Sequence, residues 1–289
     1  MKAFISLLGL VIAIGSVPIQ AANSYITGKK KMISIEKAVK AGLIKLEIKG
    51  KGGHSGNCLH LKIASKHNDS LYIVLEAGRR LNSKNNSEQD ILVTHEQIFA
   101  LRAMEKKEAD VYGFCCQASN HSPGKDSVFT VGRMADSSMI RLAEFCNKNK
   151  FPQDAVQNAV WCLSDNHNVA GIDQSVEKLR KFVCEQKHVE IPWYQKDYEQ
   201  LSTSAHAFSN RTNKISGNIN YTLTADCSLS IQLHDRDDKL MQKFTNDKKT
   251  SKGSYDYWFE LQVTNWPKGK YFIDIYAGSQ LIMKKEFEI

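Results

Sequence analysis

The chain has 289 residues, of which 42% are hydrophobic and 24% charged, and its formal net charge is +8. This composition is typical of a globular protein and excludes a low-complexity or disordered chain. Much of the positive charge lies in residues 27–53, "TGKKKMISIEKAVKAGLIKLEIKGKGG". Because these lysines alternate with apolar residues, the pattern favours the solvated face of a helix or strand over a nucleic-acid partner.

Residues 1–22 have the pattern of a signal peptide. Lys2 supplies a basic start, and an apolar run follows from Ala3 to Val17 that is short for a membrane span. Ala21 and Ala22 are small residues suited to cleavage. We therefore expect a secreted protein or one on the outer cell surface, with no transmembrane span elsewhere. The remainder is long enough for two domains.

Residues 23–190 are expected to form an α+β domain, a β-sandwich packed against a helical block. Between residues 43 and 116, apolar and polar residues alternate between Gly, Asn and Ser turns, which predicts strands. These stretches are "LIKLEIKG", "CLHLKIAS", "LYIVLEAG", "DILVTHEQIFAL" and "ADVYGFCC". Helical patterns follow at residues 135–150 with Asp136 or Ser137 as N-cap, from Phe151-Pro152 onward, and at residues 173–188 with Asp173 or Ser175 as N-cap.

Residues 191–213 are polar and are expected to form a linker. In residues 214–289 the alternation returns, with turns at 235–238, 267–269 and 278, which predicts an all-β immunoglobulin-like sandwich. The stretch "HDRDD" (234–238) lacks the glycine and distal glutamate of a calcium loop. It fits a hairpin turn, so no metal site is expected.

The C-terminal segment also has a resemblance to known domains. Its "INYTL", "HDRDDKL", "WPKGKYFIDI" and terminal "KKEFEI" resemble flagellar-hook-cap Ig-like domains and type IX secretion sorting domains. The resemblance implies export through the type IX secretion machinery. Trp266 stands where these domains usually have leucine before the proline. A purely structural Ig-like module is the alternative.

The chain has seven cysteines, an odd number for an exported protein. In an oxidising compartment we expect three disulfides and one cysteine left over. The cysteine spacing does not indicate a zinc site, and no cofactor is expected. The cysteines are Cys58, Cys115, Cys116, Cys146, Cys162, Cys184 and Cys227.

A glutamine in the second helix suggests a use for the leftover cysteine. Gln157 lies one turn before Trp161, at the border of an apolar stripe where an unpaired amide would be costly. "VQNAVW" (156–161), with the upstream Phe114-Cys115 pair, resembles the motifs of thioester domains in bacterial surface adhesins. The resemblance implies an internal thioester between the Cys115 sulfur and the Gln157 side chain, with loss of ammonia.

Several neighbouring residues have expected roles around this cross-link. Phe114 and Trp161 would screen it from water, with Asp165 and His167 in support. Cys116 is a rival for the thioester, and either Cys116 or Cys58 could instead belong to a disulfide. An alternative is a cysteine hydrolase that combines Cys115 with His121 or His167 and Asp165. The local signatures of cysteine proteases are absent, so we do not expect an enzyme or a catalytic residue.

The sequence therefore predicts an exported cell-surface binding or adhesion protein whose thioester captures amines. Its expected partners are a protein or glycan surface ligand that bears amines, and the type IX secretion machinery, without nucleic acid. The alternatives are an unreactive disulfide-bonded secreted scaffold and a secreted cysteine hydrolase.

Overall fold

The computed structural model describes residues 32–199 and 208–289. The predicted signal peptide, residues 1–22, lies outside the described residues. Within the described part, no helix combines the length and apolar character needed to cross a membrane.

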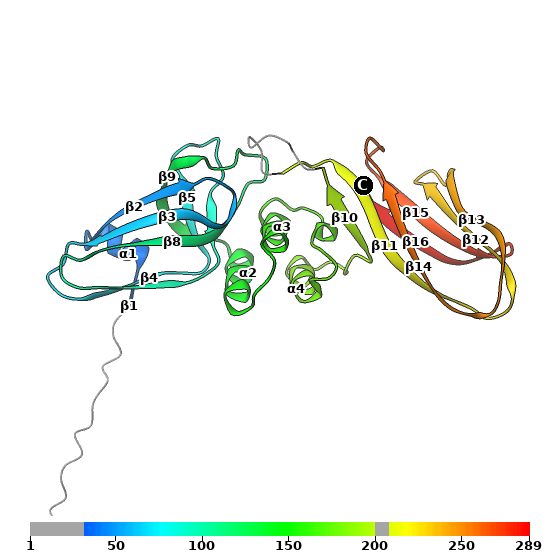
Figure 1. Ribbon diagram of the computed structural model, residues 1–289, viewed down its shortest axis with the longest axis horizontal. Coiled ribbons are helices and arrows are strands. Elements are labelled where there is room, and N and C mark those ends of the chain that lie inside the picture. The colour runs from blue at the N-terminus through cyan, green and yellow to red at the C-terminus, as the bar shows by residue number, and fades with distance from the viewer. Residues whose placement is uncertain (1–31, 200–207) are drawn as a thin grey trace, which may run out of the picture. The chain divides into compact units, whose positions relative to one another are not determined.

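A closed six-stranded barrel forms the first part of the fold (Figure 1). All neighbouring strands pair antiparallel. In the order of pairing, the strands are β2 (Ile44–Lys51), β3 (Ser55–Ser65), β8 (Lys106–Cys115), β6 (Ile91–Val93), β5 (Arg79–Ser83) and β9 (Lys125–Met134). The stretches predicted as strands over residues 43–116 do form strands, but "LYIVL" and "QIFAL" join a separate sheet, and several others close into a barrel where a sandwich was expected. The reason is that β9 pairs with both β2 and β5 and so joins the two edges of the sheet.

A three-stranded sheet and a short helix accompany the barrel. The sheet has the order β1 (Met32–Ser34), β4 (Leu71–Leu75) and β7 (Gln97–Leu101), and α1 (Ile35–Lys40) follows β1. In α1, Ile35 and Ala38 are buried while Lys37 and Lys40 are exposed. Ile44 and Ile48 of the lysine-rich segment are buried as well, as the alternation indicated, whereas Met32 and Val39 are exposed.

Three helices form the helical block: α2 (Ser137–Lys148), α3 (Gln153–Ser164) and α4 (Glu177–Lys187), with a 3-10 turn η1 (Val169–Gly171). They share one apolar core with residues of the barrel wall. Asp136 caps α2 as predicted by accepting the Met139 N–H. The predicted cap of α4 is wrong, because the Asp173 side chain holds Ser175 in a turn and the helix begins later, without a side-chain cap.

The C-terminal part contains two antiparallel sheets around one core. The first has the order β10 (Tyr194–Tyr198), β11 (Thr212–Leu223) and β14 (Gly253–Gln262). The second has the order β13 (Leu240–Thr250), β12 (Cys227–Asp235), β15 (Lys270–Ala277) and β16 (Gln280–Glu288). The three predicted turns lie between these strands. Part of the segment expected to be a linker is strand β10, which pairs with β11.

Candidate functional site

The last residue of β8 and the middle of α3 meet in a buried contact. The Cys115 N–H donates to Gln157 Oε1 at 3.1 Å, and Gln157 Nε2 donates to the Cys115 carbonyl at 2.8 Å. Cys115 is fully buried and Gln157 is 2% exposed. The structure therefore brings the two predicted residues together, and the amide that the sequence left without a partner is hydrogen-bonded at both ends.

The alternation of strand β8 sends its side chains into two different cores. Cys115 packs in the barrel core, which also contains Cys58. Phe114 and Cys116 pack in the helical core. The Gln157 amide hydrogen-bonds the Cys115 main chain at the boundary between these cores. The Cys115 sulfur therefore lies in the barrel core, and it is the main chain of Cys115 that contacts the Gln157 amide.

The seven cysteines, all of which lie in the described residues, form no disulfide. The expected three disulfides are absent. Six of the thiols are instead buried as single side chains in the apolar cores, and that of Cys227 is half-buried. Those of Cys58, Cys162 and Cys184, for example, donate to main-chain carbonyls at 3.6–3.7 Å. Burial raises the pKa of Cys58 and Cys116 to about 12 and that of Cys115 well above its ordinary value.

An aromatic cluster lies beside this contact. Trp161 is 4% exposed. Its ring centroid lies 6.1 Å from that of His54 and 5.1 Å from that of Phe208. His167 stacks on Phe208 at 4.2 Å. Trp161 thus lies beside Gln157 in the lining of one cleft, where an apolar screen would have to stand. Its Nε1, although buried, has no hydrogen-bond partner among residues 32–199 and 208–289.

Asp165 has a supporting position at the end of α3. Its Oδ1 accepts the Ala118 N–H at 2.9 Å, and Ser164 donates to its other oxygen. These bonds tie the end of α3 to the segment that follows β8. Asp165 therefore helps to fix the position of the end of α3 relative to β8.

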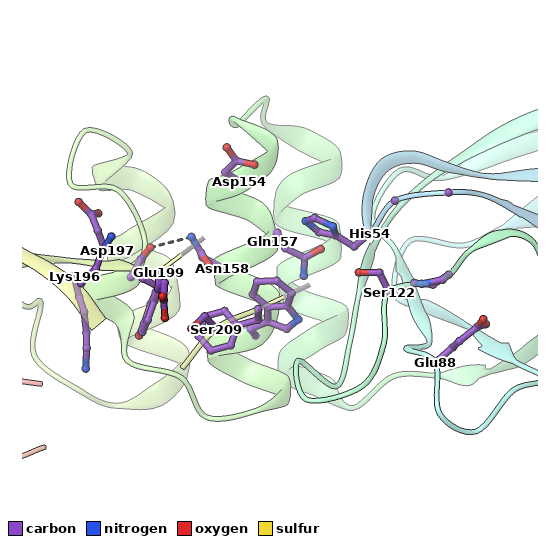
Figure 2. A pocket seen from close by; sticks show the side chains of 18 of the residues that line it. His54, Glu88, Ser122, Asp154, Gln157, Asn158, Lys196, Asp197, Glu199 and Ser209 are labelled. Atoms are coloured by element: carbon purple, nitrogen blue, oxygen red, sulfur yellow. Dashed lines mark hydrogen bonds between the residues drawn. The ribbon is translucent and has the colours of Figure 1, made fainter. Parts of the chain in front are cut away.

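A cleft of about 1220 Å³ opens over Gln157 (Figure 2). Gln157, His54 and Trp161 line it, as do residues of the segments around β10 and β11. Carboxylates of Asp154 and Glu199 also face the cleft. A small polar molecule can therefore approach the otherwise buried amide from this side. The charged groups of the lining nearly balance: four carboxylates and three lysines, namely Glu88, Asp154, Asp197, Glu199, Lys125, Lys196 and Lys214.

His54 was not predicted but is closely linked to Cys115. Its carbonyl accepts the Cys115 N–H at 2.9 Å, and its imidazole lines the cleft in the neighbourhood of Gln157 (Figure 2). Burial lowers the pKa of His54, and Asp154 partly offsets this. The ring is therefore mainly neutral at pH 7 and able to accept a proton.

The geometry gives less support to the hydrolase alternative. Asp165 is engaged with main chain, and the His167 ring stacks on Phe208. The raised pKa of Cys115 disfavours the thiolate that such an enzyme requires.

Comparisons with known proteins do not name a family for this arrangement. No protein-family model matches the chain, and no curated protein matches it.

Proposed function

We propose that this protein is an exported surface binding protein whose Cys115 and Gln157 form an internal thioester that captures amines. The observation that carries the proposal is the double hydrogen bond between the Gln157 amide and the Cys115 main chain, at 3.1 and 2.8 Å. It holds the amide carbon beside the residue that bears the sulfur. The Cys115 side chain packs in the barrel core, so the reaction requires the sulfur to turn from that core toward the amide carbon.

The main chain also prepares the amide for attack. The Cys115 N–H points at Gln157 Oε1, the atom on which negative charge develops as sulfur attacks the carbonyl carbon. The S–C bond then forms and the C–N bond breaks. The thiol proton leaves with the amide nitrogen as ammonia.

Capture reverses this exchange with a different amine. The nitrogen of a lysine side chain or polyamine that enters the cleft attacks the same carbon, and the C–S bond breaks. An amide forms, and one amine proton returns to the Cys115 sulfur. His54, mainly neutral and lining the cleft, is the group we assign to carry this proton between the amine and sulfur. Asp154, which acts electrostatically on His54, is the carboxylate we assign to attract the cationic amine.

Intact mass of the purified mature protein tests the proposal. We expect a deficit of about 17 Da, one ammonia, and a gain of about 31 Da from that state after incubation with methylamine. Denatured protein should show six reactive thiols before methylamine and seven after, because Cys115 is regenerated and all seven cysteines are otherwise free.

The adjacent cysteines offer a matched pair of variants. Cys115→Ala should abolish both mass changes, whereas Cys116→Ala should retain them, since the Gln157 amide hydrogen-bonds the main chain of Cys115. A wild-type mass without the deficit, with seven thiols, supports the unreactive scaffold. Loss of the deficit in Cys116→Ala alone assigns the cross-link to the rival cysteine.

We also propose that the C-terminal sandwich directs export, on the strength of its resemblance to type IX sorting domains. Deletion of residues 212–289, which removes β11 to β16, should leave the protein in the periplasm. Residues 190–289 placed behind a signal peptide and a reporter should bring the reporter to the cell surface. Cell fractionation measures both, and surface delivery of the truncated chain would contradict the proposal.

A further inference from the structure

Three ionisable side chains meet on the outer face of the four-stranded sheet. Leu233 of β12 and Ile273 of β15 point into the sandwich core, so the adjacent His234 and Asp274 lie on the opposite face. They are nevertheless 7% and 1% exposed. Asp238, in the turn between β12 and β13, completes the group. One ligand atom from each residue lies within 4.8 Å of the others.

Two buried atoms of this cluster have no hydrogen-bond partner in the part of the chain that the structure describes. His234 Nδ1 lies 3.0 Å from Asp274 Oδ2, but neither this nitrogen nor Asp274 Oδ1 has a hydrogen-bond partner among the described residues. Leaving such atoms unsatisfied costs about 1–3 kcal/mol each. Bonds of about 2.0–2.2 Å in a tetrahedron place the ligand atoms of zinc roughly 3.3 Å apart. The separation of His234 Nδ1 and Asp274 Oδ2, 3.0 Å, is close to this value.

Lys284 is the cation that now faces the two carboxylates. Its Nζ lies 3.4 Å from Asp238 Oδ1 and 3.6 Å from Asp274 Oδ2. The lysine side chain is 39% exposed and rests over the Phe272 ring, so it can swing into solvent when another cation takes its place. The position is thus built to hold positive charge, while the imidazole nitrogen beside it is suited to a metal and not to an ammonium group.

We propose that His234 Nδ1 and the carboxylates of Asp238 and Asp274 bind a divalent transition-metal ion, Zn²⁺. One nitrogen and two carboxylates suit zinc, whereas calcium and magnesium prefer all-oxygen sites. Two ligands are preformed, and the exposed Asp238 closes the site from its turn, with water completing the coordination. Bound metal pins the β12–β13 turn to β15. The sequence could not indicate this site, because Asp274 comes from a later strand.

Zinc titration of the untagged, chelator-treated mature chain tests the site. By isothermal titration calorimetry at neutral pH we expect saturable binding of one Zn²⁺ with micromolar or better affinity, and none of Ca²⁺ at the same concentration. Asp238→Asn should weaken zinc binding at least ~10-fold, and His234→Asn should abolish it. Lys284→Gln should strengthen it ~10-fold by removing a competing charge.

Asp237→Asn is the matched control, since Asp237 lies in the same exposed turn but outside the cluster. Its zinc affinity should equal that of the wild type. Equal affinities of wild type and Asp238→Asn would overturn the proposal by assigning the zinc to other groups, such as the half-buried Cys227. Absence of binding to the wild type would overturn it too, including the case in which only Lys284→Gln binds zinc.

Discussion

His54→Gln should slow capture of methylamine about 100-fold or more while the thioester still forms. Proton transfer by a positioned histidine contributes ~10²–10⁴ to a rate. The bond from the Cys115 N–H to the His54 carbonyl involves main chain, so the glutamine variant retains it. The mass deficit of the variant should therefore match that of the wild type, and only its disappearance with methylamine should be slow. Time-resolved intact mass measures both.

The pH profile gives this prediction a second readout. Because burial lowers the pKa of His54, the wild-type rate at constant free-amine concentration should rise with pH through a pKa below the ordinary histidine value and then level off. Asp154→Asn should move this rise to lower pH, since Asp154 opposes the effect of burial. The rise should be missing in His54→Gln.

His95 provides the control for His54→Gln. Burial lowers the pKa of His95 as well, but its ring packs on Tyr112 and does not line the cleft. His95→Gln should capture methylamine at the wild-type rate. Equal rates for His54→Gln and wild type would remove His54 from the mechanism and leave the thioester proposal standing.

Local patterns in the sequence were sufficient for the elements that carry the site. The helical period of α3 places Gln157 next to Trp161, and the alternation of β8 separates Cys115 from its neighbours Phe114 and Cys116. Both patterns depend on residues close in the chain. Cys115 as the partner of Gln157 came from the family resemblance and not from these local patterns. The observed hydrogen bonds join the Gln157 amide to the main chain of Cys115.

Closure of the barrel could not be predicted from such local sequence patterns. The stretch "KDSVFTVGRM" of β9 has weak alternation, and β5 carries two arginines, so neither resembles a core strand. Pairing of β3 with β8, distant in the chain, carries the loop "GGHSG" to the end of β8, where the His54 carbonyl meets the Cys115 N–H. The disulfide prediction failed for a related reason. Cysteine number indicates a compartment, whereas pairing requires thiols that face each other in the fold.

Arg79→Met should lower the free energy of unfolding by about 3 kcal/mol, at the lower end of what removal of one partner from a buried ion pair costs. Arg79 begins β5 and is 2% exposed. Its guanidinium donates to Glu36 in α1, to Glu76 and to the Gly132 carbonyl in β9. Methionine fills similar space but leaves Glu76 and the Gly132 carbonyl without this donor, while Glu36 keeps only its bond from the exposed Lys40. Urea unfolding followed by circular dichroism measures the change.

The adjacent Arg80 separates this effect from a general loss of charge. Arg80 pairs with Asp90, which keeps hydrogen bonds from Ser83 and Gln117 when the arginine is removed. Arg80→Met should therefore cost less than half as much. Lys40 and then Arg79 lower the pKa of Glu36, a contribution to stability that is present at neutral pH and lost as pH falls through the folded-state pKa. The destabilisation by Arg79→Met should accordingly shrink in acid, and equal costs for both arginines at neutral pH would show that the buried pair does not hold α1 to the barrel.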